Sequence, residues 1–548
     1  MYDRNISYFC NLSKFKKRIQ QVISEMVGIG NKQLSLDDIQ KILFNGEKIA
    51  LESAGIEKVQ DSYSFLQDFS KDKVIYGINT GFGPMAQYKI KDEDRISLQY
   101  NLIRSHSSGC NNLLPAIYLK AIMVARLNTL MLGYSGIHPS LVDTIKEYIN
   151  NDVYPTIYEH GGVGASGDLV QLAHLALNLI GEGEVVYKGE VQPTEKVLKE
   201  TGIKPAKIYL REGLAVMNGT SAMTGIALVN LIYAKNLLNW SISASALINE
   251  VVESYDDHFS YELNIVKHHK GQNEVAETIR KLTSDSGLVR KREEHLYDRE
   301  VKTEVISDKV QEYYSLRCVP QVLGPIADTI ANAEQVIINE LNSVNDNPVV
   351  DSQNKNVFHG GNFHGDYVSL EMDKLKIAIT KMSMLIERQL NYLLNSKLNE
   401  KLPPFVNLGI LGLNFGMQGV QFTATSTVAE NQTLSFPMYV HSIPNNNDNQ
   451  DIVSMGANAA IMTRKVIENS FEVIAIEFMT LIQAIDYLGV QDKLSSHGMS
   501  IYQELRTLVP KFEQDSIRYK EIREIKSYLL QHEALAVSVH LNGVKVAK

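Results

Sequence analysis

The sequence predicts a mainly α-helical protein, built as a bundle of long helices with a loop-rich N-terminal part. Long stretches with a helical pattern and few helix breakers occur at residues 240–255, 321–341, 370–398 and 457–488. Proline occurs only 14 times in 548 residues, mostly between these stretches. A sheet protein would show turn signals at much shorter intervals, so this spacing favours a long-helix bundle.

The composition excludes several classes of function. Hydrophobic residues make up 44% and charged residues 21% of the chain, which is ordinary for a globular protein. The net charge of −9, without a compensating basic patch, argues against a nucleic-acid partner. No stretch of 18 apolar residues stands out, so we expect no membrane partner.

Cysteine usage indicates a reducing compartment. Cys10, Cys110 and Cys318 are the three cysteines, and they show neither C-x-x-C spacing nor an even count. This pattern predicts neither a zinc site nor a disulfide framework. We therefore expect a cytoplasmic protein without a metal.

The N-terminal part divides into short elements. Residues 1–30 are basic but lack the apolar run of a secretory signal, so we expect an extra amphipathic helix. Two short helices are expected within 34–69, the first opened by Ser35, and further helices at 98–113 and 117–132. The predicted parts of the chain are a helical extension (1–30), an N-terminal domain (31–235), a central long-helix bundle (236–510) and a C-terminal helical tail (511–548).

A glycine-rich turn at residues 160–167 runs directly into an apolar helix. Glycine reaches backbone conformations that are closed to other residues, so this turn can fold tightly. Asp168 is placed to cap the helix that follows, and Gly181 to end it. The helix N-terminus would then face Ser166 with the positive end of its dipole.

The triplet Ala165-Ser166-Gly167 in this turn can do unusual chemistry. If the Gly167 amide nitrogen attacks the Ala165 carbonyl, loss of two waters closes a five-membered ring and turns Ser166 into a dehydroalanine. The product is a 4-methylidene-imidazol-5-one, an electrophile that side chains otherwise do not provide. Taken alone, the triplet also fits an ordinary glycine-rich helix cap.

Six further motifs accompany the triplet, and together they resemble the aromatic amino acid ammonia-lyase family. The resemblance covers roughly residues 30 to 510 and looks closest to bacterial tyrosine ammonia-lyases. The motifs are Tyr76-Gly-Ile-Asn-Thr-Gly-Phe-Gly83, Asn218-Gly-Thr-Ser221, Gln311-Glu-Tyr-Tyr-Ser-Leu-Arg317, Asn345-Asp-Asn-Pro348, Gly360-Gly-Asn-Phe-His364 and Asn449-Gln-Asp451.

The resemblance implies the fumarase/ammonia-lyase type of helix bundle and a homotetramer whose active sites are shared between subunits. It implies the ring as prosthetic group, with no metal and no diffusible cofactor. Tyr76 would be the base and Arg317 the two-pronged clamp for the substrate carboxylate. The implied catalytic residues are Tyr76, Ala165, Ser166, Gly167 and Tyr314, and the implied substrate-binding residues are Ser105, His106, Asn218, Gln311, Arg317, Asn347, Phe363, Asn446, Asn449 and Gln450.

The motifs disagree about the substrate. The pair Ser105-His106 looks like that of histidine ammonia-lyases, whereas Gln450 stands where those enzymes carry a glutamate for the imidazole. Without that carboxylate, histidine would lose a charge-assisted hydrogen bond of about 1.5 to 3 kcal/mol. We therefore expect deamination of L-tyrosine to trans-4-coumarate and ammonia.

Other interpretations stay open. The nearest are a histidine ammonia-lyase and an aminomutase that returns the ammonia to the β-carbon. A fumarase-like lyase would share the long helices but leave the triplet unexplained. A non-catalytic helical scaffold would need neither Tyr76 nor Ser166, and Arg317 would then form only a surface salt bridge.

Overall fold

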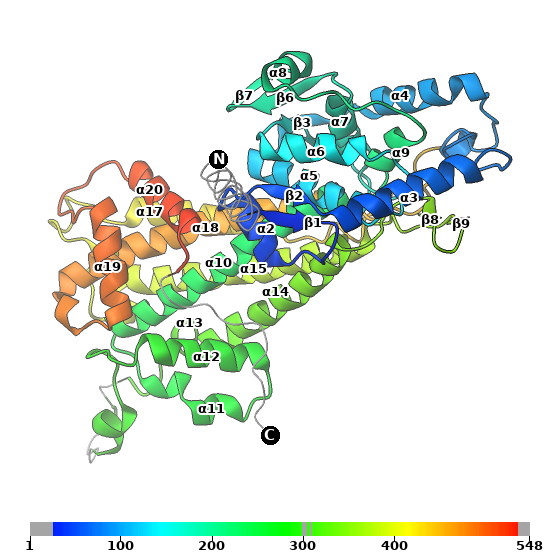
Figure 1. The fold of residues 1–548 in the computed structure, drawn as a ribbon. Helices are drawn as coiled ribbons and strands as arrows, with labels where there is room; N and C mark the ends of the chain where they lie inside the picture. The colour runs from blue at the N-terminus through cyan, green and yellow to red at the C-terminus, as the bar shows by residue number, and fades with distance from the viewer. Residues whose placement is uncertain (1–25, 299–303, 307–308, 535–548) are drawn as a thin grey trace, which may run out of the picture. The chain divides into compact units, whose positions relative to one another are not determined.

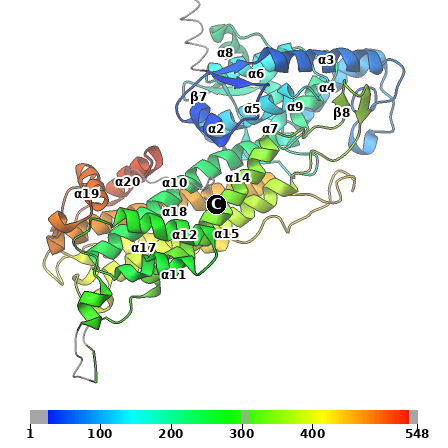
Figure 2. The same cartoon turned by 60° about the horizontal axis from the view of Figure 1, so that its bottom comes forward.

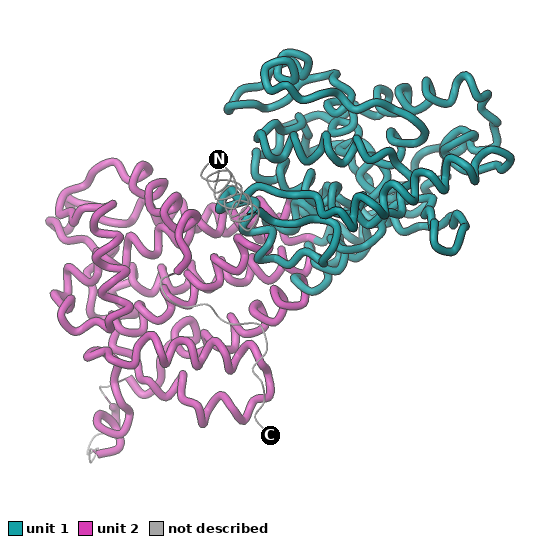
Figure 3. Tube along the Cα trace, in the orientation of Figure 1, with its two compact units in different colours: residues 1–229, 334–372, 437–461 teal, residues 230–333, 373–436, 462–548 magenta. Residues whose placement is uncertain are grey.

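The computed structural model describes residues 26–298, 304–306 and 309–534. Two compact units account for them, and each unit draws on three stretches of the chain (Figure 3). Unit 1 comprises residues 1–229, 334–372 and 437–461, and unit 2 comprises residues 230–333, 373–436 and 462–548. The expected helix within residues 1–30 lies almost wholly outside the described residues, as does Cys10.

Unit 1 mixes short helices with small sheets (Figure 1). β1 pairs with β2 in parallel, while β3–β5, β4–β6–β7 and β8–β9 are antiparallel. Its elements are β1 (Val27–Ile29), α2 (Leu36–Leu43), β2 (Ile49–Leu51), α3 (Ser53–Phe69), α4 (Arg95–His106), β3 (Cys110–Leu113), α5 (Ala116–Met131), α6 (Ser140–Asn150), β4 (Tyr154–Pro155), β5 (Tyr158–His160), α7 (Leu169–Leu179), β6 (Glu184–Tyr187), β7 (Glu190–Pro193), α8 (Thr194–Thr201), α9 (Glu212–Met217), β8 (Val349–Asp351) and β9 (Asn356–Phe358).

Four of the five boundaries between the units fall inside long helices, and the unit 2 parts of these helices run alongside one another in both views (Figures 1 and 2). These helices are α10 (Ser221–Val251), α14 (Val319–Leu341), α15 (Asp366–Leu394) and α18 (Gly456–Leu488). The other helices of unit 2 are α11 (Tyr261–Ile265), α12 (Lys270–Leu282), α13 (Tyr314–Arg317), α16 (Ser396–Asn399), α17 (Gln418–Leu434), α19 (Ser496–Leu508) and α20 (Tyr519–Gln531).

Buried amides and hydroxyls tie the helices of unit 2 together. Gln389 of α15 donates to the Ser245 hydroxyl of α10 at 3.0 Å. Asn431 of α17 donates to the hydroxyls of Ser383 and Ser470, each at 3.2 Å. Because a buried polar group is costly without its partner, these bonds fix how the apolar faces pack.

Two sequence predictions need correction. The helix expected at 240–255 is α10, which spans Ser221–Val251. The prediction missed its first half because the apolar residues there lie on all sides of the helix and give no helical periodicity. By length and composition α10 could cross a membrane, but 78% of its most apolar window is buried, as in a core helix. The helix expected at 98–113 ends at His106, because residues 110–113 pair as β3 with distant β5.

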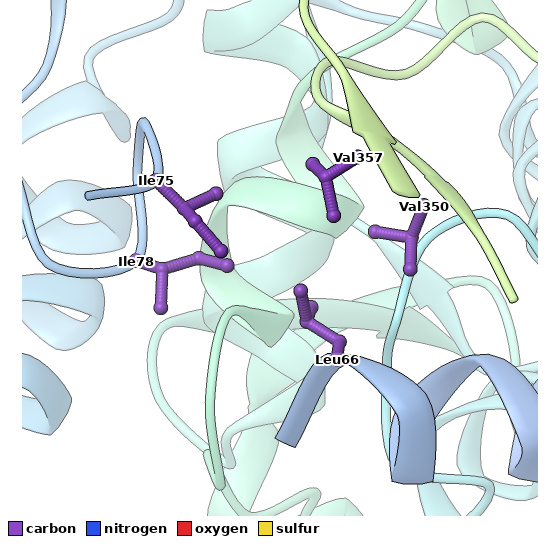
Figure 4. Packing of buried hydrophobic residues seen from close by; sticks show 5 residues of the cluster. All are labelled: Leu66, Ile75, Ile78, Val350 and Val357. Carbon is purple, nitrogen blue, oxygen red and sulfur yellow. The ribbon is translucent and has the colours of Figure 1, made fainter. Parts of the chain in front are cut away.

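A hydrophobic cluster in unit 1 holds the loop that carries Tyr76 (Figure 4). Ile75 and Ile78 flank Tyr76 and are 2% and 0% exposed. They pack with Leu66 of α3, Val350 of β8 and Val357 of β9. Burying each isoleucine contributes roughly 1.5 to 3 kcal/mol, so the loop is anchored on both sides of the tyrosine.

Candidate active site

The triplet Ala165-Ser166-Gly167 lies in the turn between β5 and α7. At two positions of this turn only glycine fits. Gly164 and Gly167 have φ values of +74° and +70°. A Cβ on Gly167 would lie 2.1 Å from the Gly219 carbonyl oxygen, and one on Gly164 would lie 2.0 Å from the Ser454 hydroxyl. The turn is therefore pressed against the backbone that precedes α10.

Two side-chain amides converge on Ser166. Gln450 Nε2 donates to the Ser166 hydroxyl at 3.0 Å, and Asn218 Nδ2 donates to the Ser166 carbonyl oxygen at 3.1 Å. Two residues further on, the backbone amide of Asp168 donates to the Gly219 carbonyl oxygen at 2.8 Å. Both oxygens of Ser166 therefore have fixed directions.

Asp168 does not cap its own helix, contrary to the sequence prediction. Its side chain instead accepts from the backbone amide of Met223 at 2.8 Å, in the first turn of α10. Burial raises the pKa of this carboxyl to about 7, although the amides of Met223 and Ala222 oppose the shift. Gly181, at φ +89°, follows the end of α7 as predicted.

Two fully buried arginines support the loops around the triplet, and the motif analysis missed both. Arg126 Nη1 donates to the Asn218 carbonyl oxygen at 3.1 Å and to Asn345 Oδ1 at 3.3 Å. Its burial lowers the pKa of the guanidinium to about 10. Arg211 forms a two-pronged ion pair with Asp346 at 3.1 and 3.0 Å. For Arg126, the available signal in the sequence was its position as the one arginine in the mostly apolar residues 119–132.

Tyr76 is half-buried, and its phenol oxygen accepts from the backbone amide of Gly83 at 3.1 Å. Asn446 adjoins the same glycine, because a Cβ on Gly83 would lie 2.8 Å from Asn446 Nδ2. Asn446 itself has φ +56°, and its carbonyl oxygen accepts from the Asn449 amide at 3.2 Å. The Tyr76 loop and the loop that delivers Gln450 therefore meet.

The other predicted residues of unit 1 make local contacts. His106 Nδ1 lies 3.0 Å from both the Ser105 hydroxyl and the Leu102 carbonyl oxygen, in the last turn of α4. Asn347 Oδ1 accepts from the Gly360 amide at 2.9 Å. Phe363 is half-buried in the turn before α15.

The three remaining predicted residues, Gln311, Tyr314 and Arg317, line an open pocket of about 830 Å³ in unit 2. Tyr314 is 71% exposed, and the Arg317 guanidinium lies 4.8 Å from the centre of its ring. Arg317 Nε is buried and has no hydrogen-bond partner among the described residues. The other lining residues are Ile306, Lys309, Glu312, Tyr313, Ser315, Arg388, Asn391, Tyr392, Lys397, Leu398 and Glu400.

The structure therefore gathers Ser166, Asn218 and Gln450 directly in unit 1, and joins Tyr76 to the same loops. In the described part of the chain, no group of three or more His, Cys, Asp or Glu side chains could hold a metal ion. The donors around Ser166 are neutral amides, which suit a polar organic group.

The chain is similar to known proteins over most of its length. The family model "Aromatic amino acid lyase" matches residues 34–507. A tyrosine 2,3-aminomutase from Myxococcus sp. (strain Mx-B0) is 39% identical over 515 residues, covering 92% of this chain and 97% of that protein. A histidine ammonia-lyase from Bacillus subtilis (strain 168) is 37% identical over 505 residues, covering 92% and 96%.

A solved structure matches the fold. The crystal structure of a tyrosine aminomutase from Streptomyces globisporus has a TM-score of 0.89 at 35% identity, covering 92% of this chain and 97% of that chain. The predicted mainly α fold and the predicted family are thereby confirmed. The chain belongs to the aromatic amino acid lyase family.

Proposed function

We propose that this protein is a tyrosine ammonia-lyase that converts L-tyrosine to trans-4-coumarate and ammonia. The observation that carries the proposal is the clamped serine: two side-chain amides, from Asn218 and Gln450, bind Ser166 on a turn that only glycine can form. An ordinary helix cap would need neither amide.

The residues around Ser166 fit a methylidene-imidazolone made from Ala165, Ser166 and Gly167. Gly167 packs so closely on Gly219 that its amide and the Ala165 carbonyl are held in one compact turn. Asn218 would hold the ring through the former Ser166 carbonyl oxygen, whereas the hydroxyl that Gln450 binds would leave as one of the two waters. The group would supply an electrophile that makes the substrate amine a better leaving group.

Tyr76 would remove the β-proton. That proton is scarcely acidic, so the reaction needs a positioned base, and a phenol held by hydrophobic anchors and a backbone amide meets that need. Arg317 would bind the substrate carboxylate, because its buried Nε has no hydrogen-bond partner in the described part of the chain.

We propose a cytoplasmic homotetramer with shared active sites. The support is the exposure of Tyr314, which is 71% open to solvent in one subunit although the family resemblance assigns it to catalysis. An exposed catalytic side chain is explained if a neighbouring subunit covers it.

The neutral side chain at position 450 favours a phenol over an imidazole as the substrate ring. The Gln450 amide is uncharged, so it cannot give an imidazole ring the charged partner that a carboxylate would provide. The Ser105-His106 pair keeps histidine as the second candidate. The named relatives keep a tyrosine 2,3-aminomutase as the third.

Two measurements test the proposal. Intact mass should show a loss of two waters, and a chain at full mass would overturn the electrophile. An ultraviolet time course with tyrosine, histidine and phenylalanine should show coumarate forming fastest. Faster urocanate would correct the substrate, and β-tyrosine as the main product by chiral chromatography would make the enzyme a mutase.

A further inference from the structure

His174 is a buried histidine that the chemistry above does not use. It lies in α7, the helix that begins directly after Asp168, and is 8% exposed. Its Nε2 accepts a hydrogen bond from the backbone amide of Gly109 at 3.0 Å. Its ring packs edge-on against Tyr158 of β5, with 5.3 Å between centroids.

The segment held by this bond joins two parts of the site. Gly109 comes three residues after His106, at the end of α4, and directly before β3. In β3, Cys110 pairs with His160, which opens the glycine-rich turn. One imidazole on the triplet's helix therefore connects the Ser105-His106 segment to that turn.

The contact leaves little room for a side chain at position 109. A Cβ on Gly109 would lie 3.0 Å from His174 Nε2 and 3.3 Å from the His160 carbonyl oxygen. Because Nε2 accepts a hydrogen bond, the ring must be neutral with its hydrogen on Nδ1. Burial lowers the pKa of His174, which keeps it in this form at neutral pH.

We propose that His174 is a positioning residue, which acts through Gly109 on Ser105 and His106 and so sets the choice between phenol and phenyl substrates. The effect on substrate choice rests on the proposed function, whereas the structural effect on residues 105–113 does not. His174 touches no reacting atom itself.

Three substitutions separate the hydrogen bond from packing. In His174→Gln the amide oxygen can reach the place of Nε2 and accept from Gly109. His174→Leu keeps most of the volume but has no acceptor. His174→Asn has the same amide on a shorter stem, which places its oxygen near Nδ1, too far from Gly109. Leu175→Val is the matched control for a packing loss on the same helix.

Hydrogen–deuterium exchange gives a readout that needs no activity. In the full-length protein, peptides covering residues 105–113 should exchange at least about tenfold faster in His174→Leu and His174→Asn. Loss of the hydrogen bond to the Gly109 amide should lower the free energy of local opening by about 1.4 kcal/mol. The wild type, His174→Gln and Leu175→Val should stay protected. Wild-type protection in both loss variants would overturn the positioning role.

Kinetics gives the second readout. We expect His106 to hydrogen-bond the phenol hydroxyl of tyrosine. In the loss variants the ratio of kcat/KM for tyrosine over phenylalanine should fall by roughly tenfold, since a displaced His106 would no longer make this bond. His174→Gln should restore the ratio, while Leu175→Val should lower stability without changing it. An unchanged ratio despite faster exchange would overturn the selectivity role. A wild type inactive on tyrosine would refute the proposed function instead, and the exchange result would still stand.

Discussion

The surroundings of Ser166 in unit 1 and the Arg317 pocket in unit 2 contrast in how their side chains are held. Ser166 has both of its oxygens bound by amides of its own unit, and the glycines on either side of it pack closely against neighbouring chain. Arg317 and Tyr314 instead line an open pocket, and Tyr314 is mostly exposed. A preorganised site needs partners that hold its groups in place. Unit 1 supplies such partners for Ser166, whereas unit 2 does not supply them for Tyr314 and Arg317.

This difference predicts two kinds of mutational effect. Substitutions at Ser166 or Tyr76 should act on the chemical step, because those groups are already in place. Substitutions at Arg317 should act on binding, because that group gains its partners only with substrate.

Ser166→Ala should reduce turnover to background. Alanine has no hydroxyl to eliminate, so the chain should keep its full mass without the loss of two waters. The fold should survive, since the substitution removes one side-chain hydrogen bond of about 0.5 to 1.5 kcal/mol. Wild-type turnover in this variant would disprove the role of the triplet, and circular dichroism would check the fold.

Tyr76→Phe should keep the mass deficit and lose kcat by roughly 10² to 10⁴, the usual contribution of a general base. The Ile75 and Ile78 anchors remain, so the loop should stay in place. Tyr88→Phe is the matched control, because Tyr88 is exposed in the same loop. If both variants lose equal activity, the loop rather than the phenol matters.

Arg317→Lys should raise KM for tyrosine more than it lowers kcat. A point charge replaces the two-pronged grip, and loss of one charge-assisted bond of about 1.5 to 3 kcal/mol corresponds to about ten- to a hundredfold in kcat/KM. Arg388→Lys is the control, because Arg388 lines the same pocket and pairs with Glu387. Equal effects of the two substitutions would show that only the charge of the pocket counts.

The sequence predicted best what depends on local pattern. The helix predicted at 457–488 spans 456–488, and Ser35 caps α2 through a capping box. Strand β3 was missed, because its partner lies about fifty residues away. Asp168 was assigned to its own helix, because its bond to the start of α10 exists only after folding.

For the site, the motifs supplied the residue names but not their grouping. Ser166 and Gln450 are 284 positions apart, and no periodicity indicates that they touch. The Arg126 contacts with Asn218 and Asn345 were invisible for the same reason. The assignment of Gln311, Tyr314 and Arg317 to the reaction stays a prediction from the family motif.

His106→Phe should shift substrate choice toward phenylalanine. Tyrosine would then bury a hydroxyl without a partner, at a cost of about 1 to 3 kcal/mol, whereas phenylalanine would no longer leave the histidine unpaired. The ratio of kcat/KM for tyrosine over phenylalanine should therefore fall by roughly tenfold or more. Steady-state kinetics on both substrates measures this. If His106 only closes the end of α4 through Leu102, both substrates should slow equally and the ratio should not change.

A last expected effect, on stability rather than on activity, concerns the half-buried His497 of α19 in unit 2. Its Nε2 has no hydrogen-bond partner among the described residues, and burial lowers its pKa to about 4. Near the start of a helix, an added positive charge is also opposed by the helix dipole.

Unfolded histidine has a pKa of about 6.5, so between pH 6.5 and 4 the unfolded chain binds the extra proton and stability falls on acidification. From pH 7 to pH 5 this one group should cost about 2 kcal/mol. His497→Gln should therefore lose less stability than the wild type over that range, as measured by urea midpoints at both pH values. His268→Gln, which changes an exposed histidine, should behave like the wild type. If the urea midpoint of His497→Gln falls on acidification as much as that of the wild type, the imidazole is not held neutral by its surroundings.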